Sequence, residues 1–169
     1  MLRIATPEDT ALIVTLGRRC FEETFAHLYN PEDLTLFLDQ DYHPQRIHDW
    51  LSDSQTHWRI AIRDDMPVGY IKWGECKLPL PPLATPQAEI HRLYVRRDYQ
   101  SAGIGRELMN EAIAHVLAAG AAEICLGVWE NNHKAIKFYH SYGFAKAGEY
   151  DFPVGRQIDR EWIMRRSLL

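Results

Sequence analysis

The spacing of apolar residues along the chain changes between the two-residue period of a strand and the three-to-four-residue period of a helix. Residues 2–5 alternate apolar and polar side chains, as in a short strand. Three helices are predicted next, over about residues 6–29, 31–38 and 44–51, because a proline stands near the start of each. The first 53 residues therefore predict one strand followed by helices.

The middle of the chain is predicted to form a hairpin and a further strand, joined by a proline-rich loop. Residues 58–62 and 68–73 have the composition of strands, and residues 64–67 between them are typical of a turn. Residues 78–86 hold four prolines and indicate a loop, too short to link two domains. The further strand is predicted over 88–95.

The second half of the chain alternates strands with helices. The strongest helical pattern covers residues 103–119 and ends at Gly120, a residue favoured after a helix C-terminus. The remaining elements are a strand, a helix and two final strands, over 123–129, 132–142, 145–151 and 159–165. This order indicates one α/β or α+β domain over residues 1–169, built on a mixed sheet.

Composition and charge exclude several classes of protein. The hydrophobic share of 46% and the charged share of 25% are ordinary globular values, unlike those of disordered or fibrous chains. A net charge of −4 argues against a nucleic-acid partner. The chain lacks the apolar run of about 18 residues that a membrane span needs, and its first nine residues do not resemble a secretory signal. We therefore expect a cytoplasmic protein without a nucleic-acid or membrane partner.

The cysteines and histidines give no sign of a disulfide framework or a metal site. Cys20, Cys76 and Cys125 are odd in number, far apart in sequence and form no C-x-x-C pair. The eight histidines include no H-E-x-x-H motif. We expect three buried free thiols and no bound metal.

The strongest chemical signal lies where the strand over 88–95 passes into the helix that begins at Gly103. Gly103 and Gly105 would let a phosphate approach the backbone, where the amides of a first helical turn have no helical acceptor. Between residues 92 and 106, four arginines and one acidic residue give a local charge of +3. Leu108 replaces the third glycine of a dinucleotide-binding motif, and no Gly-Lys-Ser/Thr follows, so both of those phosphate loops are disfavoured.

Two blocks of the sequence resemble the GNAT superfamily of acyl-CoA-dependent N-acetyltransferases. Motif A of that family, Gln/Arg-x-x-Gly-x-Gly/Ala, resembles Gln100-Ser101-Ala102-Gly103-Ile104-Gly105. The family's second block, N-x-x-A-x-x-F-Y…G-F, resembles the segment from Asn132 to Phe144. The resemblance implies a single-domain GNAT fold, with a mixed, mostly antiparallel sheet of about six or seven strands. About four helices would flank this sheet, which would be splayed at the acyl-CoA site.

A narrower resemblance is to the PaiA-type polyamine acetyltransferases. It rests on residues 22–25, 30–34 and 126–130 and on the region around Met164. The resemblances together imply an enzyme that moves an acetyl group from acetyl-CoA to a primary amine by direct attack and without a metal. The narrower resemblance implies that the acceptor is a small polyamine.

The resemblance also implies which residues hold the cosubstrate. The pantetheine arm would pair with the strand over 93–95, the diphosphate would bind the loop amides, and a backbone N–H near Leu93 or Tyr94 would bind the thioester carbonyl. Arg97 could also meet a phosphate, or could face only water. The cofactor-binding set is Leu93, Tyr94, Val95, Gln100, Ser101, Ala102, Gly103, Ile104, Gly105, Arg106, Asn132, Ala135 and Phe138.

Three residues are candidates for proton transfer. Tyr139 would protonate the CoA thiolate as a general acid, although an aromatic side chain at this position could also simply pack. Glu89 and His91 are candidates for the base, since residues two apart on a strand share a face. Plain hydrogen bonding at a strand end and a water chain to solvent are the alternatives for the base.

The N-terminal third is acidic, which is the feature that favours a cationic acceptor. Residues 1–53 hold ten acidic and four basic residues, a difference of −6. Glu22, Glu23, Tyr29 and Asp33 could bind a polyamine by ion pairs and cation–π contacts, or could form an ordinary solvated acidic face.

Two further functions stay open at this point. One is acetylation of a protein N-terminus or another small amine, and the other is a non-catalytic acyl-CoA-binding regulatory module. The expected partner is a small-molecule amine, and the resemblance also allows a homodimer.

Overall fold

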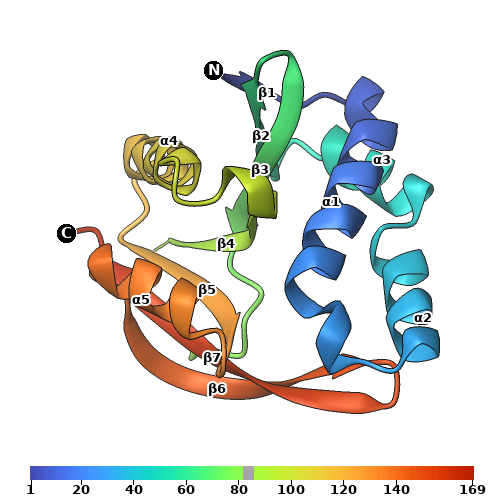
Figure 1. Ribbon diagram of the computed structural model, residues 1–169. Helices are drawn as coiled ribbons and strands as arrows, with labels where there is room; N and C mark the ends of the chain where they lie inside the picture. The colour runs from blue at the N-terminus through green and yellow to red at the C-terminus, as the bar shows by residue number, and fades with distance from the viewer. Residues whose placement is uncertain (82–85) are drawn as a thin grey trace.

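The computed structural model describes residues 1–81 and 86–169, and its centre is a seven-stranded sheet with strand order β1-β2-β3-β4-β5-β7-β6 (Figure 1). Strands β4 and β5 run parallel, and the other neighbouring pairs run antiparallel. The strands are β1 Leu2–Ile4, β2 His57–Arg63, β3 Met66–Glu75, β4 Gln87–Val95, β5 Glu123–Trp129, β6 Ala145–Val154 and β7 Gln157–Ser167. This arrangement confirms the predicted mixed, mostly antiparallel sheet.

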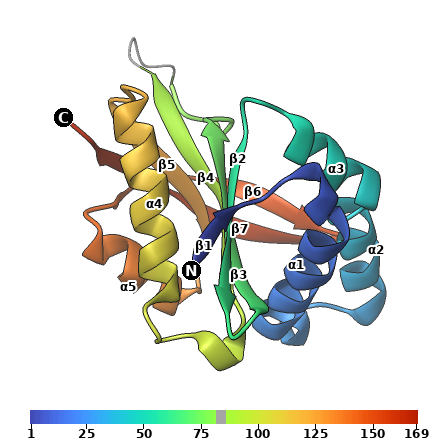
Figure 2. The same cartoon turned by 90° about the horizontal axis from the view of Figure 1, so that it is seen from above.

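Helices cover both faces of the sheet. Seen from above, α1, α2 and α3 lie on one side of the central strands and α4 and α5 on the other (Figure 2). Their bounds are α1 Thr10–Phe25, α2 Pro31–Asp41, α3 Pro44–Ser52, α4 Ile104–Ala118 and α5 His133–Ser141, with 3-10 turns at Pro7–Asp9, Ala26–Leu28 and Arg97–Tyr99. Each layer has its own buried apolar cluster, one under α4 and α5 and the other under α1 to α3.

Polar side chains form hydrogen bonds just before the first two helices. The Asp9 carboxylate accepts the Thr6 backbone N–H at 2.9 Å and pairs with Arg3, which lies on β1. Asn30 caps α2 by accepting the backbone N–H of Glu32 at 2.9 Å. The Asn30 cap satisfies an amide that a helix leaves unpaired, so the sequence predicts the start of α2 well, whereas the Asp9 bond belongs to the 3-10 turn that precedes α1.

Two predicted boundaries are wrong, and the reason is local backbone geometry. The hairpin turn holds only Asp64 and Asp65, both with positive φ, rather than residues 64–67. Such a two-residue turn matches the twist of the flanking strands, so β3 begins at Met66. The last two strands are longer than predicted because they meet at a tight turn at Gly155, where φ is +58°.

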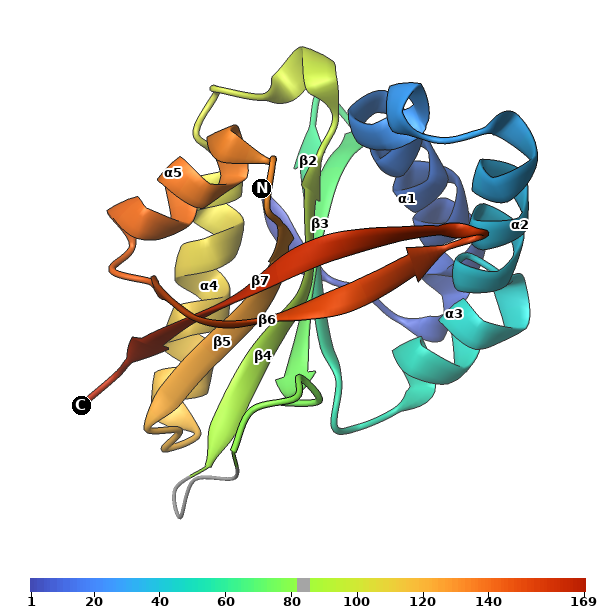
Figure 3. The same cartoon turned by 90° about the horizontal axis from the view of Figure 1, so that it is seen from below.

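The long β6–β7 hairpin reaches from the α5 side of the molecule to α2 (Figure 3). At its tip the backbone N–H and side chain of Arg156 donate to the Asp33 carboxylate at 3.2–3.3 Å. Phe152 lies edge-on to Phe37 of α2, with ring centroids 5.9 Å apart. The hairpin therefore links the last strands to the N-terminal helices.

The cysteines differ from the prediction in one respect. Cys20 and Cys125 are buried free thiols, whereas Cys76 is partly exposed. The Sγ atoms of Cys76 and Cys125 lie 2.9 Å apart across β4. The predicted loop at 78–86 falls partly on residues 82–85, which lie outside the described residues.

Neighbouring strands β4 and β5 separate halfway along their length. They pair only over Gln87–Ile90 and Glu123–Leu126, although both strands continue beyond. The register of β4 against β3 shifts at this point, so that His91 is an extra residue between the paired Ile90 and Arg92. A β-bulge of this kind bends its strand, and it accounts for the splay that the family resemblance implies. Across the described ranges, no helix has the length and hydropathy needed to span a bilayer.

Candidate active site

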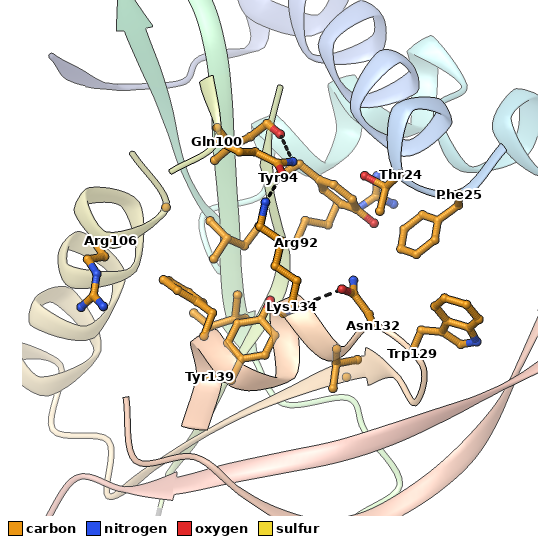
Figure 4. Close-up of a pocket in the computed structure, with 18 of the residues that line it drawn as sticks. Thr24, Phe25, Arg92, Tyr94, Gln100, Arg106, Trp129, Asn132, Lys134 and Tyr139 are labelled. Carbon is orange, nitrogen blue, oxygen red and sulfur yellow. Dashed lines mark hydrogen bonds between the residues drawn. The ribbon is translucent and has the colours of Figure 1, made fainter. Parts of the chain in front are cut away.

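A cavity of about 470 Å³ opens where β4 and β5 separate. In the view of Figure 4, Arg106 lies at one end, Phe25 and Trp129 at the other, and Tyr139 between them. Most of the predicted site residues line it, namely His91, Leu93, Tyr94, Val95, Gln100, Ser101, Gly103, Gly105, Arg106, Asn132, Ala135, Phe138 and Tyr139. The structure thus brings both sequence blocks to one cavity.

The loop before α4 presents a row of unpaired backbone amides at one end of the cavity. Among the described residues, the amides from Ser101 to Gly105 donate to no protein acceptor, whereas the Arg106 amide bonds to the Gly103 carbonyl at 3.0 Å. Ser101 and Gly103 both have positive φ, 68° and 83°, which turns this loop into the start of the helix. Such a row of N–H groups at a helix N-terminus is suited to binding a phosphate anion.

Within this loop, the predicted residues contribute in different ways. The side chain of Ile104 is buried in the core beneath α4, so only its backbone amide is available to a ligand. Ala102 is exposed. The Arg106 guanidinium lies over the Tyr142 ring at 6.0 Å and lines the cavity, so it can add positive charge beside the amides.

Gln100 fixes the loop to its neighbours through hydrogen bonds (Figure 4). Its Nε2 donates to the Val95 carbonyl at 3.0 Å, and its Oε1 accepts from the Lys134 ammonium at 2.7 Å. Lys134 lies in the first turn of α5 and also lines the cavity. The loop, β4 and α5 are therefore held together at the cationic end of the cavity.

Arg97 makes contacts away from the cavity. Its backbone N–H donates to the Glu23 carboxylate at 2.7 Å, and its guanidinium bonds to the Glu23 carbonyl. These bonds tie the loop to α1 rather than present a side chain to a ligand.

The open edge of β4 offers backbone hydrogen bonds to an extended ligand. The Arg96 amide donates to Val68 of β3 at 2.8 Å. Because bonding residues alternate along an antiparallel pair, Tyr94 also faces β3, whereas Leu93 and Val95 direct their N–H and C=O groups toward the gap. The bond from Gln100 to the Val95 carbonyl agrees with this pattern. Of the two predicted carbonyl-binding amides, Leu93 is therefore the one that faces the cavity.

Tyr139 combines a packing role with access to the cavity. Its ring contacts Phe138 and Phe144, with centroids 5.5 and 6.0 Å away. Burial, and then the charge of Glu161, raise the pKa of its hydroxyl. The hydroxyl is thus kept protonated and can donate a proton or a hydrogen bond.

The two candidate bases lie close together, but only His91 lines the cavity. Its Nε2 is 3.0 Å from the Glu75 carbonyl and 3.9 Å from the Glu89 carboxylate. Burial lowers the pKa of His91 to about 4, so its ring is neutral at pH 7. Glu89 accepts the Lys77 amide at 2.7 Å, and burial raises its pKa.

Asn132 caps α5, since its side-chain oxygen accepts the Ala135 amide at 3.2 Å. Its side chain therefore has a structural role that needs no ligand, and Asn132 also lines the cavity.

The four predicted acceptor-binding residues are absent from the described cavity lining. Glu22 is exposed, and Glu23 pairs with Arg19 at 2.7 Å. The Tyr29 hydroxyl donates to Asp159, and Asp33 binds the tip of the β6–β7 hairpin through Arg156. Three of the four therefore already have partners within the chain.

Several lining residues were missed by the sequence analysis, among them Phe25, Trp129 and Glu161. The rings of Phe25 and Trp129 meet edge to face at 6.2 Å. The Glu161 carboxylate accepts the Tyr150 hydroxyl and has its pKa raised, mainly by burial. The two-residue period of a strand indicates that Asp159 and Glu161 share one face of β7. It does not indicate that this face lies beside Tyr139.

No group of three or more His, Cys, Asp or Glu residues able to hold a metal ion occurs within the described ranges.

Comparison with known proteins identifies the relatives of this chain. A spermidine N(1)-acetyltransferase of Thermoplasma acidophilum is 26% identical over 147 residues, covering 85% of this chain and 86% of that protein. An uncharacterised N-acetyltransferase of Lactobacillus delbrueckii subsp. lactis is 24% identical over 162 residues, covering 96% and 94%. The crystal structure of PaiA N-acetyltransferase from Thermoplasma acidophilum, in complex with coenzyme A, superposes with a TM-score of 0.79. It is 23% identical to this chain and covers 99% of it and 98% of that chain.

The family model described as the acetyltransferase (GNAT) family matches residues 21–144, a range that contains α2, α3, the cavity loop, β5 and α5. Both sequence blocks and the splayed strands thus fall within the matched segment, and the chain belongs to the acetyltransferase (GNAT) family as an N-acetyltransferase.

Proposed function

We propose that this enzyme transfers the acetyl group of acetyl-CoA to a primary amine of a small polyamine. The observation that carries the proposal is the row of unpaired amides from Ser101 to Gly105 at the head of a cavity with an open strand edge. A diphosphate fits the amides, and a chain containing amide groups fits the edge of β4.

The residues present fit each part of coenzyme A. The loop amides, Arg106 and Lys134 would hold the diphosphate, and the backbone of Leu93 and Val95 would pair with the pantetheine arm. The acyl end would then lie near Tyr139, further along the cavity from Arg106 (Figure 4).

Chemistry at the acyl end needs an electrophile, an acid and a neutral amine. The Leu93 N–H would donate to the thioester oxygen as the amine nitrogen attacks the carbonyl carbon. The Tyr139 hydroxyl would protonate the departing thiolate, which its raised pKa permits at neutral pH. His91 and Glu89 remain candidates for the base, but His91 with a pKa near 4 is a weak acceptor for an ammonium proton.

Two observations support a polyamine rather than another amine. The first 53 residues carry an excess of six acidic residues, and this part of the chain packs beside the cavity through Thr24 and Phe25. A relative aligned over most of the chain is named a spermidine N(1)-acetyltransferase. A cationic acceptor fits an acidic chain segment beside the cavity and the aromatic residues in the cavity lining.

The test is a screen of acetyl transfer from acetyl-CoA, in which the release of free CoA thiol is measured for each amine. The panel is spermidine, spermine, amino acids, aminoglycosides and peptide N-termini, with Tyr139→Phe as the control for enzyme-dependent release. Polyamines should give the highest kcat/KM. Faster turnover of peptides or aminoglycosides would overturn the polyamine assignment, and CoA binding without thiol release from any amine would favour a non-catalytic module.

A further inference from the structure

A carboxylate without a cationic partner stands at the acyl end of the cavity. Glu161 lies on β7 opposite Trp129 of β5 and Tyr150 of β6, and it lines the cavity with Tyr139. Its one hydrogen-bond donor among the described residues is the Tyr150 hydroxyl. No lysine, arginine or histidine in the described ranges lies within 4.0 Å of it.

The partly buried carboxylates of this chain differ in whether a cation compensates their charge. Asp9 pairs with Arg3 at 2.6 Å and Asp41 with Arg92 at 2.6 Å, whereas Asp159, two residues from Glu161, is likewise held only by Tyr29 and Gln157 and has no cationic partner among the described residues. The groups that interact with the charge of Glu161 include the acids and phenols Asp159, Glu89, Tyr150, Tyr139, Tyr94 and Tyr29. His91 and Arg92 of β4 also line the cavity, and Arg92 is already paired with Asp41. A partly buried anion needs a compensating cation, and here a ligand can supply it.

Gly127 opens the space that this carboxylate occupies. A Cβ atom on Gly127 would lie 2.8 Å from Oε2 of Glu161 and closer still to the Tyr150 hydroxyl. Gly127 belongs to β5 where that strand has separated from β4, and it lines the cavity. The absent side chain therefore lets Glu161 reach over β5 toward the place where an acyl group would react.

Aromatic side chains at the same end of the cavity as Glu161 also favour a bound cation. Phe25 and Trp129 form an aromatic corner at the end of the cavity opposite Arg106 (Figure 4). Aromatic faces attract ammonium groups, whereas the arginine and lysine at the other end repel them. The two ends of the cavity thus have opposite preferences, anion at the loop and cation at Glu161.

We propose that Glu161 binds the ammonium group of the acceptor amine beside Tyr139 and removes its proton before the amine attacks the thioester. This inference rests on the proposed function and adds the acceptor site to it. Glu161 then takes the role of base in place of Glu89 and His91. Burial, with the charges of Asp159 and Glu89, raises the pKa of Glu161, which makes its carboxylate a better proton acceptor.

The proton and electron balance of this scheme is complete. The R–NH₃⁺ group gives one proton to the carboxylate, and the freed lone pair forms the C–N bond to the carbonyl carbon. As the C–S bond breaks, Tyr139 gives its proton to the thiolate and regains one from the nitrogen of the new amide. The products are the N-acetyl amine and the free thiol, and Glu161 releases its proton to solvent.

The decisive variant is Glu161→Gln, compared with Glu149→Gln as a matched control. Glu149 is an exposed acid on β6, next to Tyr150 in sequence but facing the other side of the strand. For Glu161→Gln we expect unchanged CoA affinity by calorimetry and a kcat/KM for spermidine lowered roughly 10²-fold or more at pH 7. The deficit should shrink as the pH rises, because more of the amine is then neutral before it binds. Glu149→Gln should match the wild type.

A second variant keeps the proposal testable if the glutamine variant is unstable. Gly127→Ala should displace the carboxylate and reproduce the loss, whereas Gly148→Ala, whose Cβ would meet Ile163 at an ordinary 3.6 Å, should not. The inference is overturned if the wild type is active and Glu161→Gln has the same kcat/KM. It is also overturned if the loss of kcat/KM in Glu161→Gln is the same at every pH. A wild type that acetylates no amine overturns the proposed function instead.

Discussion

At the scale of single residues, the proposed role of Tyr139 as the proton donor can be tested by one substitution. We expect Tyr139→Phe to lower kcat by roughly 10²–10⁴-fold, because the phenyl ring keeps the packing against Phe138 and Phe144 but cannot protonate a thiolate. CoA affinity and thermal stability should stay near those of the wild type. Thiol-release kinetics with calorimetry check this, and a kcat within threefold of the wild type would remove Tyr139 from the reaction.

His91 makes a separate prediction about stability and pH. Its pKa is about 4 in the folded chain, below the ordinary value of 6.5, so only the unfolded chain binds a proton there between these values. Stability should therefore fall as the pH drops from 6.5 to 4, with a contribution from His91 of at most about 3 kcal/mol. Urea unfolding at pH 7 and pH 4.5 measures this loss of unfolding free energy. The drop should be smaller in His91→Gln than in the wild type and unchanged in a variant of the exposed His27.

Site residues can be predicted from the sequence where they belong to one short motif. Gln100, Gly103 and Tyr139 belong to local patterns, and the structure places all three at the cavity. Phe25, Trp129 and Glu161 come from α1, β5 and β7, which only the folded sheet brings together. No spacing along the chain marks such a set, so this end of the site required the structure.

At the scale of elements, the loop before α4 can be tested through its glycines. Gly103 and Gly120 flank α4 with φ of +83° and +79°, and no atom of residues 1–81 or 86–169 lies within 4 Å of a Cβ built on either. Alanine at either position should cost about 1 kcal/mol of unfolding free energy, because left-handed backbone is strained for alanine. Only Gly103→Ala should also weaken CoA binding, since only that Cβ would stand in the row of amides. Equal CoA affinity in both variants would contradict the proposed phosphate site.

Whole helices and strands were predicted more reliably than their ends. The helices begin where capping side chains and prolines stand, at Asn30 before α2 and Asn132 before α5. The predicted first helix instead divides into a 3-10 turn, α1 and a second 3-10 turn over Ala26–Leu28. Its apolar pattern continues through these turns, so periodicity alone could not locate the break.

At the scale of the molecule, the cavity results from one extra residue and from strand order. The bulge at His91 bends β4 away from β5, and nothing in the residues 88–95 marks it. Likewise β7 lies between β5 and β6, which sequential pairing rules would not decide. This order places Glu161 in the cavity lining, at the end proposed to bind the acceptor.

Calorimetric titration can show whether the unpaired amides before α4 bind the diphosphate of coenzyme A, as we propose. The ligands to compare are CoA and pantetheine, which lacks the diphosphate and the nucleotide. We expect CoA to bind one to one and at least about tenfold more tightly than pantetheine, because several charge-assisted hydrogen bonds are lost with pantetheine. Equal affinities, or no heat with millimolar CoA, would contradict it.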